Sequence, residues 1–250
     1  MTMISSLNPL EDFPYESALV TGGAGFVGSH LCDALVTAGV KTVSIDDYIA
    51  GKSENLAHLY DYENFTETRC DVSDLEALSG VVNEVDIIFH QAASKKTVCL
   101  RDPRRDLKVN AEGTFNLLEL ARDRGVKKFV HASTGSVYGE AKYWPQDENH
   151  PVGPTSYYGV SKLAGESYVG AFNHLYDLDT TILRYFHVYG PRQEDGEFGG
   201  VVHAIPSTGC TDGLPIEDPL GPGYSSSRTP TCHSQEMFGN STADELRHLG

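Results

Sequence analysis

The chain has 250 residues, with 35 acidic and 19 basic side chains and a net charge of −16. This length allows one α/β domain with a sizeable core, and 40% hydrophobic residues are typical of a globular protein. The acidic balance argues against nucleic acid as a partner, because that binding depends on Lys and Arg at the phosphates. An acidic surface with nine lysines also suits a salt-rich cytoplasm. A halophilic source is therefore a hypothesis, which stability insensitive to molar salt would contradict.

Neither a membrane span nor a secretion signal is predicted. No apolar run approaches the ~20 residues that a membrane helix needs, and residues 1–14 lack a basic start followed by an apolar stretch. The five cysteines form no C-x-x-C pair, which favours small buried side chains in a reducing compartment over disulfides or a zinc site. They are Cys32, Cys70, Cys99, Cys210 and Cys232. We therefore expect a cytoplasmic protein without a metal site.

Strands and helices alternate along the first three quarters of the chain. In chain order, the expected strands are 17–21, 41–46, 65–70, 86–90, 128–132 and 180–184, and the expected helices are 26–38, 74–82, 104–124 and 156–175. Such alternation predicts a parallel sheet with helices on both faces, the doubly wound α/β arrangement of the Rossmann fold. Its ligand crevice lies at the carboxyl ends of the strands.

A glycine-rich loop follows the first predicted strand. Gly22, Gly25 and Gly28 would permit the tight turn, the approach of a pyrophosphate and close helix packing. Three glycines in eight residues could be simple turn punctuation, but the flanking strand and helix favour a dinucleotide site. Asp46 ends the second strand, where a carboxylate accepts hydrogen bonds from the adenosine ribose and repels a 2′-phosphate. NAD is therefore preferred over NADP, with Asp47 able to share this role; a capping role for Asp46 is the alternative.

Tyr158 and Lys162 stand one helical turn apart in the last predicted helix. A tyrosine with a pKa near ~10 is a poor base at neutral pH, and we expect the ammonium and a positive nicotinamide ring to lower that pKa. The alternative is an exposed Tyr–Lys pair on an amphipathic helix, because the Y-x-x-x-K spacing alone often occurs by chance. Ser133 and Thr134 follow the fifth predicted strand, where a hydroxyl can bond a substrate hydroxyl or cap a turn.

Together these motifs resemble the extended short-chain dehydrogenase/reductase superfamily. Within it the chain is similar to the NAD-dependent nucleotide-sugar epimerase/dehydratase family, and nearest to its UDP-glucose 4-epimerases. The resemblance runs from Ala18 to Val202. The motifs that carry it are TGGAGFVG at 21–28, HQAA at 90–93, Val109-Asn110, ASTGSVYG at 132–139, YGVSK at 158–162 and LRYFHVYGP at 183–191.

The resemblance implies roles for further residues. The cofactor contacts become Gly22, Gly25, Phe26, Val27, Gly28, Asp46, Asp47, Asp71, Val72, Ala92, Ala93, Lys95, Asn110, Tyr158, Lys162 and Phe186. Among them, Asp71 and Val72 would lie near the adenine, and Asn110 would support the active-site helix. The catalytic set would be Thr134, Tyr158 and Lys162, and the substrate contacts Thr134, Tyr158 and His187.

The residues after Thr134 discriminate within the family. Sugar 4,6-dehydratases of the family carry an Asp-Glu pair there, and UDP-glucuronate decarboxylases a Glu in the second position, whereas this chain has Gly135-Ser136. The resemblance therefore implies epimerisation of a nucleotide-diphosphate sugar, at C4 of UDP-glucose or UDP-galactose, through a 4-keto intermediate with NAD recycled. A homodimer through the helices at 104–124 and 156–175 is also implied.

Two departures from the family pattern keep other readings open. His187 stands where the family usually has Asn, and the segments that grip the nucleotide are not found after Val202. Gly, Pro, Ser and Thr make up nearly half of residues 204–250, which predicts loop or disorder with a short helix at 243–249. The alternatives are an NAD-binding remnant without activity and another nucleotide-sugar oxidoreductase or dehydratase.

The expected organisation follows from these patterns. Residues 1–16 form an N-terminal extension, 17–202 an NAD-binding Rossmann domain with the catalytic residues, and 203–250 an atypical, disordered or truncated tail. Binding of a nucleotide sugar discriminates the readings, because an epimerase must bind UDP and a remnant would bind NAD only.

Overall fold

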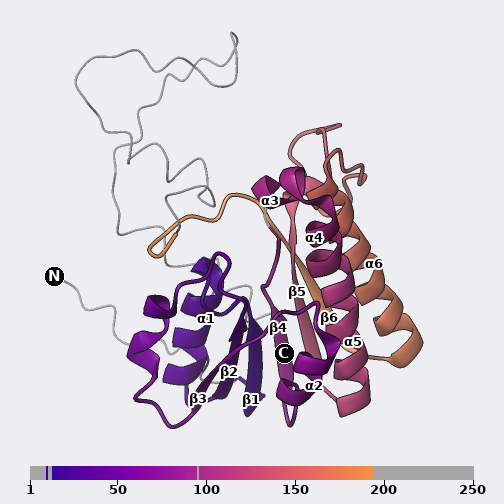
Figure 1. The fold of residues 1–250 in the computed structure, drawn as a ribbon. Coiled ribbons are helices and arrows are strands. Elements are labelled where there is room, and N and C mark those ends of the chain that lie inside the picture. The colour runs from indigo at the N-terminus through magenta and orange to yellow at the C-terminus, as the bar shows by residue number, and fades with distance from the viewer. Residues whose placement is uncertain (1–9, 11–12, 95, 194–250) are drawn as a thin grey trace, which may run out of the picture.

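The computed structural model describes residues 10, 13–94 and 96–193, which form an α/β fold around one six-stranded sheet (Figure 1). The strands are β1 (Ser17–Thr21), β2 (Lys41–Asp46), β3 (Phe65–Arg69), β4 (Ile87–His90), β5 (Lys128–Thr134) and β6 (Asp179–Tyr185). Their order is β3-β2-β1-β4-β5-β6, and every neighbouring pair is parallel. Strands β2 and β3 therefore lie on one side of β1, and β4, β5 and β6 lie on the other. In such a sheet the ligand crevice lies at the carboxyl ends of the strands where this order reverses, between β1 and β4.

Helices cover both faces of this sheet, α1 on one side and α5 and α6 on the other (Figure 1). The helices are α1 (Phe26–Thr37), α2 (Leu75–Val81), α3 (Lys96–Arg101), α4 (Pro103–Leu107), α5 (Gly113–Arg124) and α6 (Tyr157–Tyr176), with a π-helical turn at Lys108–Glu112. Short 3₁₀ turns lie at Ser53–Asn55, Ala57–Leu59 and Gly135–Val137. The predicted doubly wound fold class is confirmed.

Two hydrophobic cores lie on the two faces of the sheet. Ala18 and Val20 of β1 pack in one core with Leu35 of α1. Leu19, which points to the opposite face because strand side chains alternate, packs in the other core with Leu117 of α5. Burying a Val or Leu side chain stabilises the fold by about 1.5–3 kcal/mol. This two-sided burial fixes the register of β1, and with it the position of the glycine loop that follows.

Most boundaries lie within one residue of those expected, and the larger differences are as follows. The helix expected at 104–124 is divided into α4, the π-helical turn and α5, and it begins at Pro103 because Asp102 caps it, accepting the Arg105 N–H at 3.0 Å. β5 continues to Thr134, so Ser133 and Thr134 end the strand rather than follow it; their pairing with β6 extends it. Helix α3 was not predicted. The predicted tail at 203–250 lies outside the described residues.

The described part of the chain contains no helix that is long and apolar enough to cross a membrane. Its cysteines, Cys32, Cys70 and Cys99, are buried, as expected for small core side chains. Burial raises the pKa of the Cys32 thiol to about 12 and that of Cys70 to about 11, so neither is poised to react as a thiolate. Cys210 and Cys232 lie outside the described residues.

Candidate functional site

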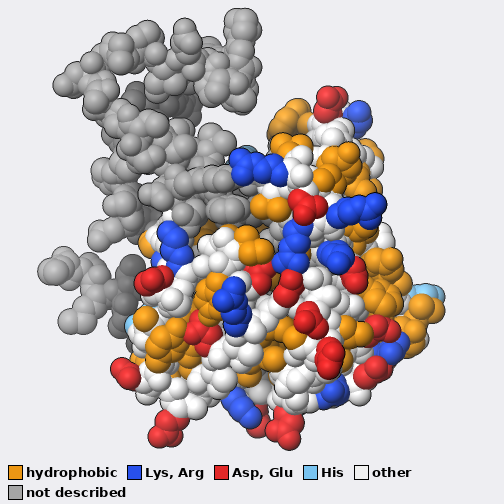
Figure 2. All heavy atoms as spheres, in the orientation of Figure 1, with side chains coloured by type: hydrophobic (Ala, Val, Ile, Leu, Met, Phe, Trp, Pro, Cys, Tyr) orange, Lys and Arg blue, Asp and Glu red, His pale blue; other side chains and the backbone are white. Residues whose placement is uncertain are grey.

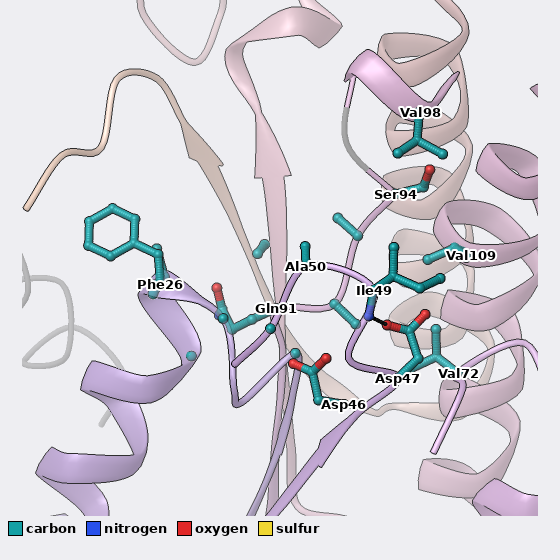
Figure 3. A pocket seen from close by; sticks show the side chains of 18 of the residues that line it. Phe26, Asp46, Asp47, Ile49, Ala50, Val72, Gln91, Ser94, Val98 and Val109 are labelled. Atoms are coloured by element: carbon teal, nitrogen blue, oxygen red, sulfur yellow. Dashed lines mark hydrogen bonds between the residues drawn. The ribbon is translucent and has the colours of Figure 1, made fainter. Parts of the chain in front are cut away.

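A cavity of about 330 Å³ opens at the carboxyl ends of the strands (Figure 3). Fourteen of the residues predicted for the site line it: Gly22, Gly25, Phe26, Val27, Gly28, Asp46, Asp47, Asp71, Val72, Ala92, Ala93, Thr134, Tyr158 and Phe186. Lys162 and Asn110 are buried behind it and His187 is exposed outside it, while Lys95 lies outside the described residues. The structure thus brings residues of β2, β5, α1 and α6, and of the segments that follow β1, β3, β4 and β6, to one crevice.

The glycine loop between β1 and α1 forms an open cradle on the cavity wall. Gly22 has a φ of +67°, a left-handed conformation that favours glycine, and a Cβ on Gly28 would lie 2.1 Å from the Gly22 carbonyl oxygen. Gly25 caps α1 without any side-chain hydrogen bond, so the first-turn N–H groups of the helix keep no capping partner. Free N–H groups at a helix N-terminus bind phosphate, and this cradle fits the pyrophosphate of a dinucleotide.

We expect Gly28→Ala to weaken NAD binding by at least about tenfold, a loss of roughly 1.4 kcal/mol. The added methyl group meets backbone at 2.1 Å, so the turn that carries the cradle must shift. Isothermal titration calorimetry with NAD measures the change. Gly170→Ala is the matched control, because a Cβ there meets nothing within 4 Å. NAD affinity equal to wild type in Gly28→Ala would contradict the cradle.

Asp46 holds a fixed position at the end of β2. Its carboxylate is only 7% exposed and accepts the Ala24 N–H at 3.1 Å and the Tyr48 N–H at 2.8 Å. Burial raises the pKa of Asp46, and the two backbone hydrogen bonds offset part of that rise. The carboxylate therefore also anchors the loop after β2, and its contact with a ribose stays a prediction.

Asp47 and Asp71 are joined by an arginine that sequence reasoning missed. Arg105 of α4 donates to Asp71 Oδ2 at 2.6 Å and to Asp47 Oδ2 at 2.7 Å. Burial raises the pKa of Asp71, but the hydrogen bonds from Arg105 and Ser73 outweigh it, so the net pKa is lowered. The Asp102-Pro103 capping signature was the available signal, since it places Arg105 in the first turn of a helix.

Tyr158 and Thr134 meet at the other end of the cavity. Tyr158 lies in the first turn of α6, whose cap Ser156 accepts the Gly159 N–H at 3.1 Å. Burial raises the pKa of Tyr158 to about 12, although its hydrogen bond with Thr134 lowers it in part. Desolvation of the phenolate therefore dominates in the protein alone, and a lowering of this pKa by Lys162 together with a bound nicotinamide ring stays a prediction. In the protein alone the phenol of Tyr158 therefore keeps its proton at neutral pH.

Lys162 is 1% exposed, and its Nζ has no hydrogen-bond partner among the described residues. Burial lowers the pKa of Lys162 to about 8, while the nearby carboxylates of Glu166 and Asp106 raise it in part. A buried ammonium without a partner is costly. This free donor, one turn below Tyr158, fits the hydroxyl groups of a nucleotide ribose.

The depressed pKa of Lys162 predicts a pH dependence of stability. Between about 8 and its ordinary value of 10.5 the unfolded chain binds a proton that the folded chain has released, so stability rises with pH. Relative to Lys162→Met, wild type is expected to be less stable at pH 7, by on the order of 3 kcal/mol at most. Urea unfolding of both proteins from pH 7 to 10 measures their free energies of unfolding, and the difference between the two should become smaller above pH 8. A difference independent of pH would contradict the prediction.

Asn110 joins three segments behind the cavity. Its Nδ2 donates to Ser161 Oγ of α6 at 3.1 Å and to Asp106 Oδ1 at 3.0 Å, and its Oδ1 accepts the Ser94 N–H at 2.8 Å. These contacts place Asn110 where it can support α6, and its contribution to cofactor binding stays a prediction.

Several cavity residues were not predicted. Figure 3 shows Ile49 and Ala50 after β2, and Gln91 and Ser94 after β4. All four lie in loops that leave the carboxyl ends of strands, and extending the search to the residues after each strand would have found them. Phe186, which was predicted, lies at the cavity and stacks on Tyr138 with ring centroids 6.0 Å apart.

Comparison with known proteins agrees with this geometry. Residues 18–207 match the model of the NAD dependent epimerase/dehydratase family. A UDP-glucose 4-epimerase of Mycolicibacterium smegmatis is 43% identical over 190 residues, which is 74% of this chain and 60% of that protein. Two solved structures are also similar. The UDP-glucose 4-epimerase of Thermotoga maritima with UDP-glucose has 38% identity and a TM-score of 0.71, covering 76% of this chain and 61% of that one. The Thermus thermophilus UDP-glucose 4-epimerase complex with NAD has 37% identity and a TM-score of 0.68, covering 76% and 60%.

The chain spans about three fifths of the length of the curated epimerases that it matches. The match covers the glycine cradle, the cavity and the Tyr158–Lys162 pair. The resemblance seen in the sequence motifs is confirmed: the chain belongs to the NAD dependent epimerase/dehydratase family.

Proposed function

We propose that this protein binds NAD in the cavity and interconverts the C4 epimers of a UDP-sugar, UDP-glucose and UDP-galactose. The observation that carries the proposal is the placement of Tyr158 and Thr134 in the same cavity as the glycine cradle, with Lys162 buried behind them. Relatives named as UDP-glucose 4-epimerases support the choice of substrate.

Each group has a chemical task in this proposal. The cradle at 22–28 holds the pyrophosphate, Asp46 accepts from the adenosine ribose, and Lys162 donates to the other ribose. When bound, NAD supplies a hydride acceptor for the sugar carbon and a positive charge in the cavity. Tyr158 exchanges a proton with the C4 oxygen of the sugar, and the Thr134 hydroxyl donates a hydrogen bond to that oxygen.

Gly135 and Ser136 support epimerisation over loss of water. A Cβ on Gly135 would lie 2.9 Å from the Phe186 ring, so the space beside Thr134 is already filled by an aromatic side chain. Neither Gly135 nor Ser136 carries a carboxyl group that could act as a general acid or base. Oxidation and reduction at one carbon needs a hydride acceptor, which NAD would supply, and one group that takes the hydroxyl proton and later returns it. Tyr158 is placed for that proton transfer.

The alternative is a protein that binds NAD without catalysis. It is favoured by one observation: the match to the family model ends at residue 207, so residues 208–250 do not resemble the family's nucleotide-gripping segments. Calorimetric titration of UDP-glucose into NAD-saturated protein separates the two. Saturable binding in the micromolar to millimolar range expected of a substrate supports the epimerase. Binding of NAD without binding of UDP-glucose contradicts it and supports the cofactor-binding module.

A homodimer is a further part of the proposal. Tyr168, Leu175 and Tyr176 of α6 are between 41% and 66% exposed, and Figure 2 shows hydrophobic side chains gathered over the α6 side of the molecule. Sedimentation velocity of the full chain measures the assembly, and a sedimentation coefficient of a monomer would contradict a dimer.

A further inference from the structure

Arg105 lies on the wall of the cavity between the ends of β2 and β3. Its two terminal nitrogens are both engaged, one by Asp71 at 2.6 Å and the other by Asp47 at 2.7 Å, and the first also lies 3.3 Å from Ser73 Oγ. All three charged side chains are less than one third exposed. The guanidinium is therefore held between two carboxylates, in the part of the crevice that follows β2.

Both carboxylates are themselves fixed by local backbone turns. Asp47 accepts the Ile49 N–H at 3.0 Å through Oδ1, an interaction drawn in Figure 3, and leaves Oδ2 for Arg105. Asp71 accepts the Ser73 N–H at 2.9 Å through Oδ1 and likewise gives Oδ2 to Arg105. Two preorganised acceptors therefore compete with any ligand for the same cation.

The end of the second strand is where a Rossmann fold distinguishes the two nicotinamide dinucleotides. A carboxylate there accepts a hydrogen bond from the ribose 2′-hydroxyl of NAD, whereas an arginine nearby accommodates the 2′-phosphate of NADP. Arg105 has the geometry for the second task, because a guanidinium binds phosphate through two parallel hydrogen bonds. Asp47 and Asp71 already occupy the nitrogens that such binding would use.

We propose that Arg105 is a specificity-determining residue, which Asp47 and Asp71 withhold from a 2′-phosphate so that the cavity selects NAD over NADP. The inference rests on the proposed binding of NAD in this cavity. It assigns the selectivity to the salt bridges of Arg105 as well as to the carboxylate of Asp46. Releasing one side of Arg105 should therefore create affinity for the 2′-phosphate.

Asp47→Asn is the variant that releases Arg105 with the least disturbance. The amide oxygen can still accept the Ile49 N–H, while the amide NH₂ that replaces Oδ2 cannot accept from the guanidinium. We expect the ratio of NADP affinity to NAD affinity to rise by about tenfold or more, the effect of one charge-assisted hydrogen bond. In Asp47→Asn combined with Arg105→Met this gain should disappear. Calorimetry with NAD and with NADP measures both dissociation constants.

Two further variants make the test specific. Asp71→Asn releases the other side of Arg105 and should shift the ratio in the same direction. Asp86→Asn removes an equal charge from the opposite end of the sheet, where Asp86 pairs with Lys127 at 2.8 Å, and should not shift it. An equal gain in the Asp47→Asn/Arg105→Met protein would overturn the role of Arg105, as would no gain in either single release variant. Wild-type protein that binds neither dinucleotide would overturn the proposed function and this inference together. Wild-type protein that binds NAD, with no change of the affinity ratio in the release variants, would overturn the inference alone.

Discussion

Tyr158→Phe is expected to lower the rate of epimerisation by about 10²–10⁴-fold, the usual contribution of a positioned acid–base group. The substitution removes only the phenolic oxygen. Thr134 keeps its hydrogen bond from the Ser136 N–H at 3.1 Å, and the glycine cradle is untouched. The affinity for NAD should therefore change far less than the rate. The rate is measured with UDP-galactose as substrate and NAD binding by calorimetry.

Tyr157→Phe is the matched control, because it removes the same atom from the neighbouring residue. Tyr157 is 59% exposed and does not line the cavity. Its substitution should leave the rate of epimerisation at the wild-type level. Equal losses in both variants, or a Tyr158→Phe protein with full activity, would contradict the assignment of Tyr158 as the proton-transfer group.

Glu166→Ala is expected to lower the free energy of unfolding by about 3–5 kcal/mol, the cost of leaving one partner of a buried ion pair alone. Glu166 Oε2 lies 2.7 Å from Arg184, its Oε1 accepts the Arg184 Nε–H at 3.0 Å, and the Ser133 hydroxyl donates to Oε1 at 2.5 Å. The Glu166 side chain is 6% exposed and that of Arg184 23%, so water cannot replace these contacts fully. Urea unfolding measures the change.

The same substitution should also disturb the site, because Ser133 precedes Thr134 in β5. Asp123→Asn is the control for the loss of an ion pair: it breaks the exposed contact with Arg122, and the unfolding midpoint should not change. Equal stability of wild type and Glu166→Ala would show that the network around Arg184 contributes nothing, which contradicts the account of how β5, β6 and α6 are held together.

The fold follows from local patterns to a large extent. The bounds of β1 and β2 are as expected, because the hydrophobic strands 17–21 and 41–46 end at a glycine turn and at Asp46. The glycine cradle and Tyr158 are brought to one cavity because both follow strand ends or helix starts at the same edge of the sheet. Local sequence is sufficient there, because the parallel topology places the carboxyl ends of all the strands at one edge of the sheet.

What the sequence did not reveal depends on contacts between distant residues. The bridge from Arg105 to Asp47 and Asp71 spans 58 and 34 positions, and no periodicity in the chain marks it. The raised pKa of Tyr158 arises from burial that only the packed structure defines. His187, expected at the substrate, is exposed outside the cavity, and its contact with a sugar nucleotide stays a prediction.

The most direct test of the central claim is exchange of the C4 epimers by the full chain. The protein is saturated with NAD and given UDP-galactose, and the C4 proton of the sugar is followed by NMR in low and in molar salt. The account predicts conversion to an equilibrium mixture with UDP-glucose, at a rate about 10²–10⁴-fold lower with the Tyr158→Phe protein. Tight binding of NAD without any exchange would contradict epimerisation and leave a protein that holds the cofactor alone.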